Sequence, residues 1–193
     1  MSWKVTTPPE FEPVSLADAK AYLRVQHSAE DDLIEQIISA ARDYCEQELD
    51  LAIMDQEITL KLDAFPRNRV ICLPRANLIE VVSFDYLDSA GDSQPFTDYT
   101  EDSFQTPARL VNNTGTWPEI LDNAGSITIV YRAGYGPDQT SGGYPPPGSI
   151  LQAMRMLITH WYDNRNAVMI GATPAELQLA VASCLHKHRR LGV

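Results

Sequence analysis

The sequence predicts an α+β protein, in which a helix pair at each end of the chain forms one helical core and a small antiparallel β-domain is inserted between them. Three patterns predict it: helical apolar spacing up to residue 51, apolar–polar alternation in residues 52–143, and helical spacing again from residue 144. Neither helix pair can bury its own apolar faces, so we expect the two pairs to pack together. The predicted units are therefore residues 1–51 and 144–193 for the core and residues 52–143 for the β-domain.

Serine residues mark the predicted starts of both N-terminal helices. Residues 1–13 contain three prolines and are expected to form an extended arm. The hydroxyl group of Ser15 can cap a short first helix, and Ser28 is expected to cap a longer second helix that ends near Leu49. Glu30, Asp31 and Asp32 then lie in the first turn of the second helix, where the helix dipole favours negative charge.

The central segment alternates apolar and polar residues in short runs, as strands do. Strands are expected at residues 58–62, 70–73, 82–86 and 126–132, with a weaker one at 109–111. Residues 96–100 are expected to return as the hairpin partner of the strand at 82–86. Four glycines then indicate a flexible loop: Gly134, Gly136, Gly142 and Gly143.

The C-terminal helices have equally clear boundaries. Pro147 is expected in the first turn of a third helix that runs to about Asn164. Thr173 and Glu176 have the spacing of a capping box, which predicts the start of a last helix. That helix ends in the basic stretch HKHRR, residues 186–190.

Charge and composition exclude several classes of protein. The chain has a formal net charge of −11, and its first 64 residues hold fourteen acids against five bases. General nucleic-acid binding is disfavoured, because affinity for phosphates comes mainly from Lys and Arg. No apolar run approaches the roughly 20 residues of a membrane helix, and the N-terminus lacks the apolar region of a secretory signal. Three widely separated cysteines, Cys45, Cys72 and Cys184, do not form a disulfide framework.

No catalytic, cofactor or metal motif is present, so neither an enzyme nor a cofactor is predicted. Cys184, His186 and His188 are spaced by two residues and point to different sides of a helix, which disfavours a zinc site. His160 and Asp163 lie three residues apart and can hydrogen-bond, but a structural contact is the simpler interpretation.

Two segments resemble a known family. The segment PVSLADAKAYLRVQHSAEDDLIEQIISAARDYCEQEL (residues 13–49) resembles the N-terminal signature of the phage head–tail connector, or head-completion adaptor, family of long-tailed phages and related prophages. The segment PPPGSILQAMRMLITHWYDNRNAV (residues 145–168) is similar to the family's second signature, a helix that ends in a Tyr followed by an Asn-Arg pair. Here these residues are Tyr162, Asn164 and Arg165. The strands between the two segments resemble the longer subgroup of the family.

The resemblance implies a structural virion protein located in the neck and assembled in the bacterial host cytoplasm. Family members form a ring, commonly dodecameric, under the portal protein. The ring extends the DNA channel, through which double-stranded DNA passes without specific binding, and offers a platform for a stopper or tail-completion protein. Free subunits can stay monomeric, and no membrane is involved. The resemblance implies portal docking by residues 185–193, with Lys187, His188, Arg189 and Arg190 as contacts.

The acids at the start of the second helix suggest a further role within that expectation. Glu30, Asp31, Asp32 and Glu35 could form an acidic face that lines the DNA channel or joins neighbouring subunits. Three alternatives stay open at this point: another neck or tail-completion protein, a small cytoplasmic enzyme that uses His160 and Asp163, and a carbohydrate- or host-binding module that displays Trp117. Trp3 and Trp117 can be interface anchors or loop plugs.

Overall fold

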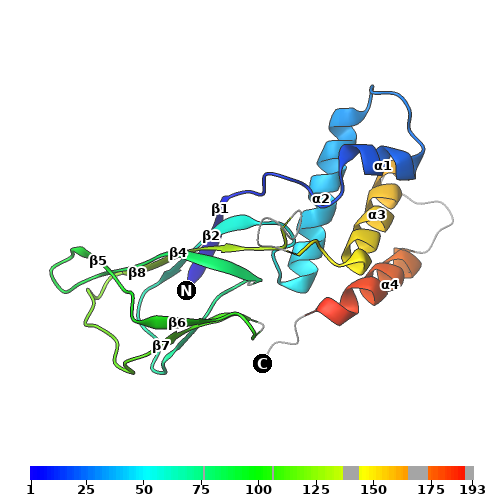
Figure 1. The fold of residues 1–193 in the computed structure, drawn as a ribbon. Helices are drawn as coiled ribbons and strands as arrows, with labels where there is room; N and C mark the ends of the chain where they lie inside the picture. The colour runs from blue at the N-terminus through cyan, green and yellow to red at the C-terminus, as the bar shows by residue number, and fades with distance from the viewer. Residues whose placement is uncertain (76, 106, 137–143, 165–173, 190–193) are drawn as a thin grey trace.

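The structure is a computed structural model that describes residues 1–75, 77–105, 107–136, 144–164 and 174–189. Within these ranges it has four α-helices and two antiparallel sheets, which confirms the predicted α+β class. Figure 1 shows how these elements are arranged. The elements in chain order are β1 (Ser2–Thr7), α1 (Leu16–Leu23), α2 (Asp31–Leu49), β2 (Gln56–Leu62), β3 (Val70–Cys72), β4 (Leu78–Leu87), β5 (Ser93–Pro95), β6 (Tyr99–Asp102), β7 (Arg109–Asn112), β8 (Ile127–Ala133), α3 (Gly148–Asp163), α4 (Pro174–Leu185) and the 3-10 helix η2 (His186–His188).

The helix boundaries agree with the sequence except at the starts of α2 and α3, and Thr173, the predicted cap of α4, lies outside the described residues. Ser15 caps α1, because its Oγ accepts a hydrogen bond from the Asp18 N–H at 3.1 Å. The prediction that Ser28 caps α2 is wrong. Its carbonyl accepts from the Asp31 N–H at 3.3 Å in a turn before the helix, and Glu30 occupies the N-cap position without a side-chain bond. Pro147 likewise precedes α3 instead of lying in its first turn.

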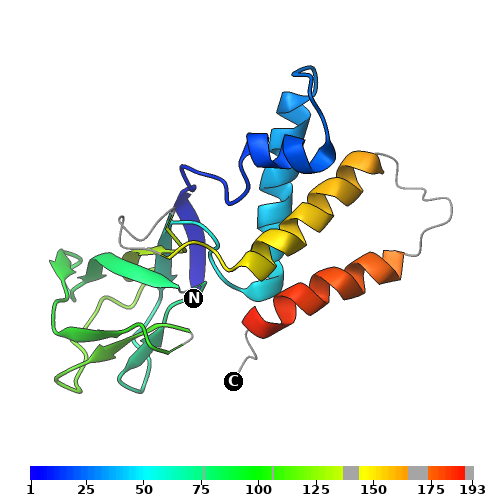
Figure 2. The same ribbon diagram turned by 45° about the vertical axis from the view of Figure 1, so that its right-hand side comes forward.

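All four helices contribute to one apolar core. α2 and α3 are its centre, and Figures 1 and 2 agree that α3 lies between α1 and α4. Tyr44 and Trp161 meet edge to face with ring centroids 6.1 Å apart, which joins α2 to α3. The fully buried members of this core come from both ends of the chain and include Ile34, Ile38, Leu49, Ile150, Met154 and Val181.

The larger sheet has five strands in the order β1-β2-β8-β4-β5. Its centre is the β2–β8 pair, in which alternate residues of both strands are buried, as the alternation in the sequence predicted. The extended arm predicted for residues 1–13 is in part a strand of this sheet, since β1 pairs with β2 from Ser2 to Thr7. Prolines 8, 9 and 13 follow that strand, where they interrupt no ladder. The domain division therefore differs from the predicted one at residues 2–7.

The prediction that residues 96–100 return as the hairpin partner of the strand at residues 82–86 is wrong. β4 pairs with β5 at Ser93–Pro95, while Tyr99–Asp102 forms β6 and pairs with β7 in the second sheet. That sheet has three strands in the order β3-β7-β6. The chain changes sheets between Pro95 and Tyr99, because the aromatic rings of Phe96 and Tyr99 both pack on Phe84 in the core that the two sheets share.

The start of the predicted glycine loop is a tight junction between the sheet and the helical core. Gly134 has φ +135°, and its N–H donates to Asn77 O at 2.9 Å. A Cβ at this position would meet Met54 O at 2.1 Å, so only glycine fits. Tyr135 then forms a parallel bridge with Met54. Gly142 and Gly143 lie outside the described residues.

Candidate functional site

The acidic start of α2 is divided between internal contacts and free surface. Glu30 accepts a hydrogen bond from the Tyr162 hydroxyl group, and Asp31 pairs with Lys20 at 2.5 Å between Nζ and Oδ1. Asp32 and Glu35 are exposed. The four predicted acids therefore do not form one free face: two tie α2 to α3 and α1, and two point to solvent.

The family-motif residues at the end of α3 have structural roles. Tyr162 joins α3 to the beginning of α2 through Glu30. Asn164 ends the helix, since its backbone N–H and its side-chain Nδ2 both donate to His160 O at 3.0 Å. Arg165 lies outside the described residues.

His160 and Asp163 are not hydrogen-bonded to each other in the described part of the chain. The Nδ1 of His160 lies 3.4 Å from the side-chain nitrogen of Asn164 instead. Asp163 is exposed at the last position of α3. Among the described residues, no hydrogen bond links His160 to a Ser, Thr or Cys side chain of the kind that a catalytic His–Asp pair activates.

The C-terminal basic segment continues directly from α4. His186–His188 form η2, and the Arg189 N–H donates to Leu185 O at 3.1 Å. His188 is held against the start of α3, because its Nε2 lies 2.8 Å from Ser149 Oγ. Lys187 and Arg189 are exposed, which leaves two cationic side chains available to a partner. Arg190 lies outside the described residues.

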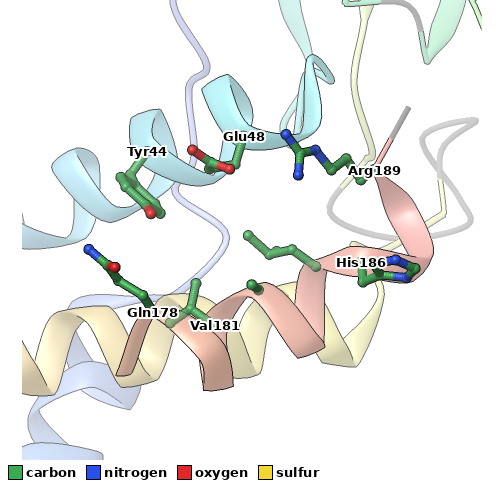
Figure 3. A pocket seen from close by; sticks show the side chains of 8 residues that line it. Tyr44, Glu48, Gln178, Val181, His186 and Arg189 are labelled. Atoms are coloured by element: carbon green, nitrogen blue, oxygen red, sulfur yellow. The ribbon is translucent and has the colours of Figure 1, made fainter. Parts of the chain in front are cut away.

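A groove separates α2 from α4 next to that segment. Figure 3 shows Tyr44 and Glu48 projecting from α2 toward Gln178 and Val181 of α4. His186 and Arg189 line the groove at its η2 end. The groove therefore combines an apolar floor with one carboxylate and one guanidinium group, a lining suited to a protein contact.

Trp117 is a loop plug in the β-domain. Its ring stacks on Phe65 with centroids 4.5 Å apart and planes 5° apart, and its Nε1 donates to Asn68 O at 2.8 Å. A sugar-binding face on this ring is disfavoured, since Phe65 already covers it. Trp3 on β1 is more exposed, at 38%, and the guanidinium group of Arg75 lies 4.8 Å from its ring centroid.

Sequence reasoning missed a buried ionic junction between the helical core and the β-domain. Glu46 of α2 is 1% exposed and accepts hydrogen bonds from the Ile53 N–H at 2.9 Å, Gln56 Nε2 at 3.0 Å and Arg75 Nη1 at 2.8 Å. Arg42 lies one turn earlier, with its Nη1 3.6 Å from Glu46 Oε2. Burial raises the pKa of the Glu46 carboxyl, while the Ile53 N–H and the two arginines act in the opposite direction.

The same junction holds the N-terminal arm. Arg42 Nε donates to Glu12 Oε2 at 2.9 Å, so the chain between β1 and α1 is fixed to α2. The signal in the sequence was the i,i+4 pair Arg42–Glu46 beside the inward face of α2, where charged residues are rarely buried unless paired. Burial of this pair could not be foreseen, because its partners Gln56 and Arg75 come from the β-domain.

The described part of the chain contains no group of three or more His, Cys, Asp or Glu side chains placed to hold a metal ion. Within the same ranges, no helix combines the length and the apolar character needed to cross a bilayer.

Comparisons with known proteins agree with the predicted resemblance. Residues 13–71 match the model of the phage gp6-like head–tail connector protein family. This segment runs from just before α1 into β3, and the match confirms the predicted resemblance over that part of the chain. No curated protein sequence matches.

Solved structures with a similar fold cover the whole chain. A chain from the neck of an empty GTA particle, computed with C6 symmetry, has a TM-score of 0.83 at 22% identity, covering 100% of this chain and 97% of that one. A chain from the virion of the native gene transfer agent (GTA) particle has a TM-score of 0.80 at 20% identity, and one from the neck of the native particle, computed with C12 symmetry, has 0.74 at 21%, with the same coverage. The chain therefore has the fold of these proteins.

Proposed function

From the premise that residues 13–71 carry a head–tail connector match, we propose that this chain is a subunit of the connector ring in the neck of a tailed phage or phage-like particle. The proposal is supported mainly by two similarities that agree with each other, one in sequence and one in fold. The matched segment contains α1 and α2, and the full chain shares its fold with neck proteins from end to end. The shared helical core supports it further, since both ends of the chain close into one scaffold.

The proposed ring joins its subunits head to tail, so each subunit presents two different faces to its neighbours. A dodecameric ring in the virion is the stoichiometry we propose, with free subunits that can be monomeric. Assembly then takes place on the particle, in the bacterial host cytoplasm, where a preformed partner holds the subunits in place.

Docking onto the portal is assigned in this proposal to residues 185–193. Lys187 and Arg189 are exposed, and the bond between Ser149 and His188 fixes where η2 leaves the helical core. The basic segment assigned to this contact is Lys187, His188, Arg189 and Arg190, and its start is held in place by the Ser149–His188 contact. These residues offer positive potential to an acidic surface on the portal. The opposite end of the ring would carry the stopper or tail-completion protein.

Passage of DNA is the second part of the proposal. Asp32 and Glu35 are exposed side chains on the first turns of α2, in a chain whose net charge is −11. Carboxylates that line a channel repel phosphates, so double-stranded DNA slides through without adhering. Glu30 and Asp31 support this face indirectly, because their contacts with Tyr162 and Lys20 fix the start of α2.

The test of the proposed function is binding to particles. Purified protein is incubated with DNA-filled, tailless heads that carry the portal, and with heads that lack it. Cosedimentation with portal-bearing heads alone is expected. Equal binding to both, or to neither, contradicts the proposal.

Charge reversal tests the docking segment. The double variant Lys187→Glu/Arg189→Glu should reduce binding at least tenfold. Lys4→Glu/Lys61→Glu, which makes the same charge change at exposed positions of the β-domain, should bind normally. Normal binding by the first variant would remove the basic segment from the contact while leaving the connector function in place.

A further inference from the structure

The helical core and the β-domain have separate apolar interiors. The buried side chains around the four helices form one cluster, and those between the two sheets form another. In the described chain, every broad contact between elements joins helix to helix or strand to strand. Figures 1 and 2 both show the sheets beside the helical core and not stacked on its faces. An interface within one chain that is not large and apolar permits motion of its two sides relative to each other.

Left-handed backbone conformations mark the junction between the two units. Asp50 has φ +49° where the chain leaves α2 for β2, and Gly134 has φ +135° where it leaves β8. Arg75 has φ +48° in the connection between β3 and β4, and its carbonyl accepts from the Ala52 N–H at 3.3 Å. Asp50 ends a helix, where this conformation is common, whereas Arg75 does not. Arg75 therefore holds a strained conformation at the contact between the two units.

The side chain of Arg75 joins α2 to β1. Its Nη1 donates to Glu46 Oε2 at 2.8 Å, and its guanidinium group lies 4.8 Å from the ring centroid of Trp3. Among the described residues, its buried Nε has no hydrogen-bond partner. A buried N–H without an acceptor and a left-handed backbone both cost free energy, and Arg75 carries both. Its contacts with Glu46 and Trp3 offset these costs only while the two units keep their present orientation.

Space for movement lies beside this contact. A hollow of about 360 Å³ opens between the N-terminal arm, α2 and β2, where its lining includes Pro8, Gln47 and Arg75. Six of the nine residues that line it are polar or charged. Turning of the β-domain toward α2 can therefore close this hollow without separating either apolar cluster.

We propose that the β-domain turns as one unit about a hinge at Asp50 and Gly134. The ion pair between Arg75 and Glu46 is the latch that holds the orientation seen in this structure. In such a hinge, a few residues at the ends of elements absorb the change in backbone angles. The hinge belongs to the single chain and does not depend on the proposed ring. Within that ring, it lets the β-domain fit a neighbour while the helical core stays in place.

The distance between two spin labels tests this hinge. In a chain with Cys72→Ser and Cys184→Ser, the labels are attached at Gln36→Cys on α2 and Val82→Cys on β4, which are both exposed. Double electron–electron resonance should give one narrow distance distribution for the latched chain. Arg75→Gly removes both the latch and the backbone strain, and should displace this maximum or add a second one.

Two further variants separate the latch from a general effect of substitution. Arg24→Gly is the matched control, because Arg24 is an exposed arginine with φ +61° at the end of α1. It should leave the distribution unchanged. Glu46→Gln keeps the shape of the side chain and removes its charge, so it should change the distribution in the same direction as Arg75→Gly.

A second label pair separates hinge motion from unfolding. Gln36→Cys and Leu179→Cys lie on α2 and α4, and their distance should stay narrow in both latch variants. Broadening of this distance as well would show that the variants loosen the fold, which overturns the hinge. An unchanged distance between α2 and β4 in both latch variants overturns it too. Either result leaves the connector function standing, since binding to portal-bearing heads is measured separately.

Discussion

The hydroxyl group of Tyr162 donates a hydrogen bond to the carboxylate of Glu30, a residue 132 positions earlier in the chain. This bond joins the end of α3 to the start of α2, so it connects the two halves of the helical core that the β-domain separates in sequence. Tyr162 belongs to the C-terminal motif, and Glu30 lies within the segment that matches the connector family. The two resembling segments are therefore in direct contact.

Removal of the Tyr162 hydroxyl group should destabilise the protein. Tyr162→Phe keeps the ring and loses the bond to Glu30, which should lower the free energy of unfolding by about 1 kcal/mol. Urea denaturation measures this free energy of unfolding. Tyr144→Phe is the matched control, since Tyr144 is 73% exposed. Equal stability of the two variants would show that the bond contributes nothing.

The buried Glu46 should be the most sensitive carboxylate of the protein. Glu46→Ala leaves Arg75 and Arg42 without their shared partner, and breaking such a buried pair should cost about 3–5 kcal/mol in the free energy of unfolding. The neighbouring exposed residue gives the control, Gln47→Ala, with a change within about 0.5 kcal/mol. A small effect of Glu46→Ala would mean that the helical core and the β-domain are held together by other contacts.

Gly134 should not tolerate a side chain. Gly134→Ala forces a Cβ against the Met54 carbonyl at a positive φ, and should cost about 2 kcal/mol or more. Gly148→Ala at the start of α3 meets no atom within 4 Å and should leave stability unchanged or slightly raised. Thermal unfolding of both variants checks the prediction, and a stable Gly134→Ala would contradict the close approach.

Cys45 and Cys72 should differ in reactivity. Burial raises the pKa of the Cys45 thiol to about 12, so at pH 8 it is neutral and shielded. Iodoacetamide should alkylate exposed Cys72 in the native protein and spare Cys45, while denatured protein should be labelled at both. Mass spectrometry identifies the alkylated cysteines. Rapid native labelling of Cys45 would show that the helical core is open.

The same thiol gives a pH dependence with a definite sign. The folded pKa of Cys45 lies above the ordinary thiol value of 9.0, so the native state retains the proton to higher pH than the unfolded chain does. The stability from the buried thiol is complete below pH 9 and is lost as the pH rises toward about 12. Cys45→Ala should reduce this alkaline loss of stability.

Charge reversal at the exposed acids of α2 should affect DNA and not ring formation. Asp32→Lys/Glu35→Lys replaces repulsion of phosphates by attraction, so particles should release DNA more slowly while the ring still assembles. Glu101→Lys/Glu119→Lys makes the same charge change at exposed positions of the β-domain and is the control. Unchanged DNA release from the first variant would exclude Asp32 and Glu35 from the channel.

Periodicity predicted the parts of the fold in which a single face is buried. β2 and β8 alternate because one side of each packs in the core, and α2 and α3 repeat at helical spacing for the same reason. β1 was missed as a strand because it lies at a sheet edge, where most of its residues are exposed and give no apolar pattern. The return strand β5 has three exposed residues, so its sequence also shows no apolar–polar alternation.

Candidate site residues were predictable only where their roles are local. Ser15 at the N-terminus of α1 follows from neighbouring residues, whereas Glu46 depends on Gln56 and Arg75 across the junction. The acids at the start of α2 looked alike in sequence. Tertiary contacts separate them, since Glu30 and Asp31 have partners on α3 and α1.

We propose that the closed four-helix scaffold is the repeating unit of a neck ring. The most direct measurement is cryo-electron microscopy of necks assembled with this protein, at a resolution that separates helices. We expect a ring of copies below the portal, each with α1 to α4 in one core and the β-domain projecting from it. Density for the neck in which this chain is absent, or lies outside any symmetric ring, would contradict the account.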